Sequence, residues 1–186
     1  MERIIFFDTE TGGTNPDKHS LLSVGMVAWD RNNGIIKTQE VFLKSENYVF
    51  TNEAKKINKF DREKHDAIAA SHGDAVDGIR DFCITYSGQT SEIQIAGHNI
   101  QFDVAFLKKL FQEQNRSFNR LFSHRMIDTY SILKFLVDSE RIDLNPISSA
   151  GAFKLFGIKV NGRHSALGDA VATAQLYETL INYFEK

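Results

Sequence analysis

The stretch Ile4-Ile5-Phe6-Phe7-Asp8-Thr9-Glu10 decides the fold that the sequence predicts. Four consecutive apolar residues predict a strand that is buried on both faces. This strand continues into two carboxylates at positions i and i+2, and because side chains alternate across a strand, Asp8 and Glu10 face the same side. Taken alone, the pattern fits equally well a strand that ends in two solvated acids. Buried acids would instead need a cation, and further inward-facing acids later in the chain would favour this second interpretation.

The composition is that of one globular domain. The chain has 186 residues, of which 42% are apolar and 15 are Phe, so it is long enough to bury a sizeable core. We expect a single domain over residues 1–186. The net charge of −2 excludes a basic protein that coats nucleic acid non-specifically, but not an enzyme that grips a few nucleotides.

Cysteine usage and the N-terminus indicate the compartment. The single Cys83 cannot form an internal disulfide, and it lies on an apolar helical stripe, which favours a buried, inert thiol. The N-terminal apolar run is too short for a signal peptide or a membrane span. We therefore expect a reducing, cytoplasmic setting with no membrane partner.

The first half of the chain continues with strands and then helices. Strands are expected at residues 21–29 and 35–43, joined by the hairpin signal Asn32-Asn33-Gly34. A helix over residues 53–64 carries five Lys or Arg residues, which form either a solvated face, the favoured interpretation, or a patch that meets phosphates. Ser71 and Asp74 resemble a capping box at the start of a helix that ends at Gly88.

A second acid pattern follows a short strand at residues 93–96. In Gly97-His98-Asn99-Ile100-Gln101-Phe102-Asp103, Asn99 suits the N-cap of a helix. At 100° per residue, Asp103 falls within the apolar stripe of that helix. An acid in a buried face requires a metal, a cationic partner or a proton.

The last third of the chain adds two more candidate residues. Residues 125–128 resemble an edge strand, and Asp128 is more consistent with a helix cap than with catalysis. Asn145-Pro146 predicts a helix start, and Gly157 its end. The final helix begins after residue 165 with Asp169 in its first turn, and His164 precedes it. Each could be incidental, since an acid there also complements the helix dipole.

Together, three motifs carry a resemblance to a known family. Asp8-Thr9-Glu10, His98-Asn99-x-x-Phe102-Asp103 and His164-x-Ala166-x-x-Asp169 resemble the motifs of the DEDDh (DnaQ-like) 3′→5′ exonucleases, which include the proofreading epsilon subunits of bacterial DNA polymerase III. A lone DxE pattern is weak, but three motifs in order across the chain are specific. The resemblance implies an α/β protein with a ribonuclease H-like fold, a five-stranded mixed sheet flanked by helices.

The resemblance also implies a mechanism. Asp8, Glu10, Asp103 and Asp169 would hold two divalent cations, Mg²⁺ or Mn²⁺, and His164 would accept the proton of the attacking water. We expect substrate contacts from residues of the same motifs and of the segments beside them: Thr9, Thr11, Gly12, Thr14, Asn58, Phe60, His98, Asn99 and Phe102. Thr14 and Asn58 depart from the common family pattern, which bears on substrate preference.

Several functions are weighed on this basis. The favoured one is an exonuclease acting on single-stranded 3′ ends of DNA in proofreading or repair, with a DNA polymerase as a further candidate partner. The alternatives are RNA trimming and a module that binds nucleic-acid ends or a polymerase without cleaving. A nucleotide-binding oxidoreductase fails because no glycine-rich fingerprint follows the first strand.

Overall fold

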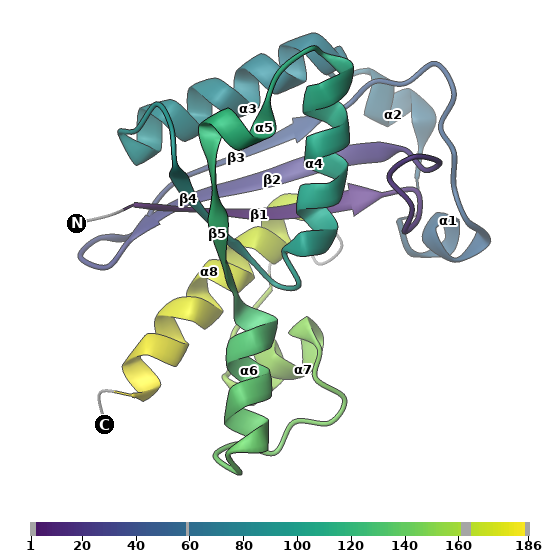
Figure 1. Cartoon of the computed structure of the whole chain (residues 1–186). Coiled ribbons are helices and arrows are strands. Elements are labelled where there is room, and N and C mark those ends of the chain that lie inside the picture. The colour runs from purple at the N-terminus through teal and green to yellow at the C-terminus, as the bar shows by residue number, and fades with distance from the viewer. Residues whose placement is uncertain (1–2, 59, 161–164, 185–186) are drawn as a thin grey trace.

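Strand β1 (Ile4–Thr11) lies at the centre of a five-stranded sheet in the computed structural model, which describes residues 3–58, 60–160 and 165–184 (Figure 1). The strand order is β3-β2-β1-β4-β5, with β2 (Leu21–Asp30) antiparallel and β4 (Ile93–Gly97) parallel to β1. The edge strands are β3 (Gly34–Phe42), antiparallel to β2, and β5 (Phe122–Asp128), parallel to β4. The expected five-stranded mixed sheet is therefore confirmed.

Strand β1 is buried on both faces, as its apolar run predicts. Ile5 and Phe7 belong to the core on the side of α3 (His72–Ser87) and α4 (Gln101–Glu113). Ile4 and Phe6 belong to the core on the opposite side, under α8 (Ala166–Tyr183). Because side chains alternate, the acids of β1 face α8 and Thr9 faces α4.

The remaining helices are short and flank this core. Their bounds are α1 (Asn52–Asn58), α2 (Arg62–Asp66), α5 (Phe118–Leu121), α6 (Thr129–Asp138) and α7 (Ser149–Leu155). Helix α8 also packs on a separate apolar cluster with α6 and α7, below the sheet in Figure 1. Among the described residues, no helix combines the length and the apolar character needed to cross a membrane.

Several local expectations are confirmed. The Ser71 hydroxyl oxygen accepts a hydrogen bond from the Asp74 backbone N–H at 3.2 Å, and Gly88 ends α3 in the left-handed conformation. Asp128 caps α6 by accepting from the Tyr130 N–H at 2.9 Å. Cys83 is fully buried, and burial raises the pKa of its thiol, which keeps it protonated and unreactive.

Three expectations are wrong. The single helix over residues 53–64 is instead two helices, α1 and α2, because Asp61 caps a new start at Arg62. Asn99 is not an N-cap: it has a φ of +57°, and its backbone N–H donates to Asp128, which forms the turn between β4 and α4. The helix expected at residue 145 begins later, because Ser148 provides the capping oxygen for α7.

Candidate active site

Three carboxylates from opposite ends of the chain converge at the end of β1. Asp8 and Glu10 come from β1, and Asp169 comes from the first turn of α8. Each offers one oxygen, and these oxygens all lie within 4.8 Å of one another. This separation allows one divalent cation to contact all three, since Mg²⁺ and Ca²⁺ bind carboxylate oxygens at about 2.0–2.6 Å. We call these three residues the acidic triad.

A glycine on β2 lets α8 reach the triad. A Cβ atom added at Gly25 would lie 2.2 Å from the carbonyl carbon of Ala166 and 2.4 Å from the backbone nitrogen of Leu167. The first turn of α8 therefore rests directly on the backbone of β2, and Gly25 pairs with Asp8 in the sheet. The expectations from sequence missed Gly25, although an isolated glycine within an apolar strand signals a close backbone approach.

A fourth carboxylate, Asp103, is buried next to the triad on α4. Its side chain is only 3% exposed, which confirms that an acid lies within the buried stripe of this helix. The Thr9 hydroxyl donates a hydrogen bond to the Asp103 carboxylate at 2.7 Å. Thr9 thus ties the other face of β1 to α4, and its side chain is committed to positioning Asp103.

Burial and the charges of neighbouring carboxylates raise the pKa values of three of these acids. Burial first, and then the charges of Asp103, Asp169 and Glu10, raise the pKa of Asp8 well above its ordinary value. Burial is also the main reason that the pKa of Glu10 and that of Asp103 are each raised to about 7. The largest charge effects on Asp8 and Glu10 come from other carboxylates. A site of this kind favours either protons or a cation.

A fifth acid, Glu40 on β3, lies beside the triad and was missed from the sequence. Asp8, Gly25 and Glu40 occupy one row across three strands. Glu40 accepts a hydrogen bond from the Ser23 hydroxyl at 2.9 Å, and its charge contributes to the raised pKa of Glu10. Strand alternation alone could not identify Glu40, because its placement depends on the register between β2 and β3.

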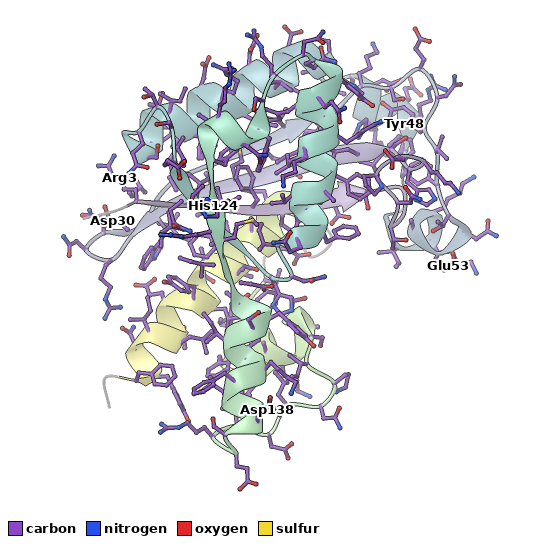
Figure 2. The ribbon with its side chains drawn as sticks, viewed as in Figure 1. Arg3, Asp30, Tyr48, Glu53, His124 and Asp138 are labelled. Atoms are coloured by element: carbon purple, nitrogen blue, oxygen red, sulfur yellow. The ribbon has the colours of Figure 1, made fainter. Side chains whose placement is uncertain are left out.

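A pocket of about 260 Å³ opens directly beside Glu10. Four of the expected substrate residues line it: Thr9, Thr11, Thr14 and Phe102. The other wall comes from α1 and includes Ile57, whose side chain is 52% exposed. Glu53, labelled at the lower right of Figure 2, marks this wall of the pocket. Ile57 is an addition to the expected set, and it supplies an apolar surface where Thr14 does not.

Other expected substrate residues lie elsewhere. The ring of His98 is bonded to the Thr129 hydroxyl at 3.1 Å, so it holds the turn after β4, as Asn99 does. Phe60 packs against Tyr48, with ring centroids 4.7 Å apart, and lines a separate pocket of about 120 Å³ between Glu10 and Glu40.

Gly12 has a structural role in this arrangement. Its N–H donates to the Ser20 carbonyl at 2.7 Å, and its carbonyl accepts from the Thr51 N–H at 2.7 Å. The Gly12 amide is therefore already occupied, and the glycine clamps the loop after β1 to the segment before α1. Two further expectations cannot be placed: His164 and the side chain of Asn58 lie outside the described residues.

Comparisons with known proteins find a matching family model and two kinds of relative. A family model described as an exonuclease (RNase_T) matches residues 5–177. The chain is 24% identical over 180 residues to the DNA polymerase III subunit epsilon of Treponema pallidum, of which it spans 77%. It is 26% identical over 182 residues to the 3′-5′ exonuclease DinG of Staphylococcus aureus, of which it spans only 18%.

The fold is similar to that of a solved nuclease. All of this chain superimposes on 43% of E. coli exonuclease I in complex with a dT13 oligonucleotide, with a TM-score of 0.82 and 16% sequence identity. At this identity the match concerns the fold alone. The exonuclease I chain and DinG are both much longer than the region that this chain resembles.

Proposed function

This chain belongs to the exonuclease family, as a DEDDh (DnaQ-like) member with a ribonuclease H-like fold, and from this premise we propose that it hydrolyses nucleic acid from the 3′ end and releases nucleoside 5′-monophosphates. The observation that carries the proposal is the acidic triad, whose oxygens lie within 4.8 Å of one another beside the buried Asp103. Half-buried acids so close to one another and to the buried Asp103 destabilise the fold unless they serve a cation.

The donor set suits hard divalent cations. Carboxylate oxygens favour Mg²⁺ or Mn²⁺, whereas a zinc site usually includes His or Cys ligands. Asp8, Glu10 and Asp169 would hold the ions, with Asp103 completing the site from α4. Two such ions would stabilise the charge that develops on the attacking and leaving oxygens of the phosphodiester.

We assign the general base to His164 on the strength of its motif. A neutral imidazole, with an ordinary pKa of about 6.5, can accept the proton of a water molecule near neutral pH. His164 stands one residue before the cap of α8, the helix that carries Asp169. The His164→Ala variant should lose about 10²–10⁴-fold in rate while keeping its affinity for metal. A variant that keeps the wild-type rate and pH profile would contradict the assignment.

The pocket beside Glu10 is the proposed site of the terminal nucleotide. Phe102 and Ile57 present apolar surface to a base, and Thr11 and Thr14 border the same space. DNA is the favoured substrate, because the relatives include a DNA polymerase subunit and a nuclease solved with a dT13 oligonucleotide. Proofreading or repair, in association with a DNA polymerase, is the role that fits these relatives.

Matched oligonucleotides test the proposal. DNA and RNA 20-mers of one sequence, labelled at the 5′ end, would be incubated with Mg²⁺ or Mn²⁺ at pH 6–9 and with EDTA as a control. We expect a ladder that shortens from the 3′ end, requires metal and disappears in Asp8→Asn. Immediate release of the 5′ label as a mononucleotide would overturn the direction, and no cleavage with either metal would overturn the function. Faster degradation of RNA would move the substrate assignment to RNA.

A further inference from the structure

A second charged pocket lies far from the acidic triad. It has a volume of about 280 Å³ and is formed by α3, the loop that follows it, and the segment from α4 to α5, at the top of Figure 1. Its walls carry three arginines and three further hydrogen-bonding side chains: Arg80, Arg116, Arg120, Thr90, Asn115 and Ser117. We call it the arginine pocket.

The positive charge of this pocket is largely uncompensated. Arg116 lies 3.6 Å from Asp77, but both side chains are at least half exposed, so this pair stabilises little. Arg80 and Arg120 form no ion pair with another residue in the part of the chain that the structure describes. Three arginines thus line one cavity in a protein whose net charge is −2.

The chemistry of the lining favours phosphate. A guanidinium presents paired N–H donors that match two oxygens of a phosphate group. The hydroxyls of Thr90 and Ser117 and the amide of Asn115 add neutral donors at the same site. Leu121 is the one apolar side chain among the lining residues, so hydrogen-bonding side chains dominate the lining.

We propose that the arginine pocket binds a backbone phosphate of the strand that the enzyme degrades, upstream of the 3′ end. The inference rests on the proposed exonuclease function. Asp103 and Arg116 are thirteen residues apart, mostly along α4, which corresponds to about 20 Å. A strand stacked as in duplex DNA advances about 3.4 Å per nucleotide, so the pocket would meet a phosphate about six nucleotides from the scissile bond, or fewer where the single strand is extended. A trinucleotide whose 3′ end occupies the active site is too short to reach it.

The test compares long and short strands. Binding of 5′-fluorescein-labelled dT20 and dT3 would be measured in EDTA, by anisotropy over a series of salt concentrations, for the wild type and for the double variant Arg80→Ala/Arg120→Ala. The control is Arg141→Ala, an exposed arginine outside the pocket. We expect dT20 affinity to fall about 5–20-fold in the double variant, with a salt slope smaller by about 1 to 2. Binding of dT3 and the control variant should be unchanged.

Four results would overturn the proposal. The first two are an unchanged dT20 affinity in the double variant and a loss of dT3 affinity equal to that of dT20. The third is a thermal shift by thymidine monophosphate that the double variant loses while it still binds dT20. The fourth is a loss of poly-glutamate binding in the double variant while dT20 binding is retained. The third would indicate a free nucleotide and the fourth an acidic protein. If the double variant fails to fold, the exposed Arg120→Ala alone is measured. Turnover of dT3 with Mg²⁺ tests the proposed function separately, because the pocket takes no part in it.

Discussion

Asp8 and Asp30 lie on neighbouring strands but in opposite chemical settings. Asp30, at the left end of the sheet in Figure 2, is only 6% exposed and accepts hydrogen bonds from the backbone N–H groups of Asn32 and Asn33 at 2.9 and 2.7 Å. The Asn33 side chain, the strongest influence, lowers the pKa of Asp30, and Arg3 lies 3.8 Å away. Asp8 has carboxylates as its charged neighbours, and its pKa is raised.

Burial alone therefore does not mark a functional acid. The chain satisfies Asp30 with its own donors, so this carboxylate stabilises the hairpin between β2 and β3. At Asp8 the same fold concentrates negative charge instead, so a bound cation or proton has to neutralise it. The pKa of Asp8 is raised and that of Asp30 is lowered, and each shift has a measurable consequence.

The largest expected difference is in activity. Asp8→Asn should lower the exonuclease rate by roughly 10³-fold or more, because it removes a ligand from the proposed metal site. Asp30→Asn should leave the rate within about twofold, because the hairpin is remote from the triad. The assay is degradation of labelled dT20 at saturating Mg²⁺. Equal losses in both variants would erase the distinction between the two acids.

The next effect tests how α8 is seated. Gly25→Ala should reduce the rate on the order of 10²-fold, because a Cβ only 2.2 Å from Ala166 displaces the turn that carries Asp169. The matched control is Gly78→Ala in α3, where the nearest atom to an added Cβ is 4.0 Å away. That change should keep full activity and slightly raise the melting temperature. Activity in Gly25→Ala close to that of the control would show that α8 is not held by this contact.

A smaller effect concerns stability and pH. The carboxyls of Glu10 and Asp103 have a pKa of about 7 in the fold, above their unfolded values. The unfolded chain thus binds fewer protons between about pH 4 and pH 7, and stability falls as pH rises through this range. Without metal, the melting temperature should be several degrees lower at pH 8 than at pH 5.5. Mg²⁺ or Mn²⁺ should reverse most of the loss.

Asparagine variants distinguish an acid whose pKa is raised, Asp103, from one whose pKa is lowered, Asp30. Asp103→Asn should flatten the pH dependence and raise the melting temperature of the metal-free protein at pH 8. Asp30→Asn should lower the melting temperature, because the hydrogen bonds from Asn32 and Asn33 favour the charged form. The same sign of change in both variants would contradict the assignment.

The smallest expected effect belongs to Glu40. Its charge acts on the site from β3, so Glu40→Gln should raise the half-saturating Mg²⁺ concentration about two- to fivefold at low salt. The rate at saturating metal should be unchanged. Glu46→Gln, at an exposed position, serves as the control. A loss of rate that metal cannot restore would place Glu40 among the direct ligands.

Local patterns predicted the acids but not their surroundings. The alternation of β1 placed Asp8 and Glu10 on one side, and helical periodicity placed Asp103 in a buried face. Gly25 and Glu40 could not be found in this way, because their roles depend on the register between strands. The prediction that Asn99 caps a helix was wrong for a related reason: its backbone N–H donates a hydrogen bond to Asp128, 29 residues away. Long-range partners of this kind are not encoded in local propensity.

The seating of α8 on Gly25 has a consequence for when the enzyme becomes active. Asp8 and Glu10 emerge early in translation, and Asp169 follows more than 150 residues later. A nascent chain can form the β1–β2–β3 meander while the segment that completes the triad is still inside the ribosome. On the proposed mechanism hydrolysis needs Asp169, so a truncated or partly synthesised chain that lacks α8 would not degrade the nucleic acid around it.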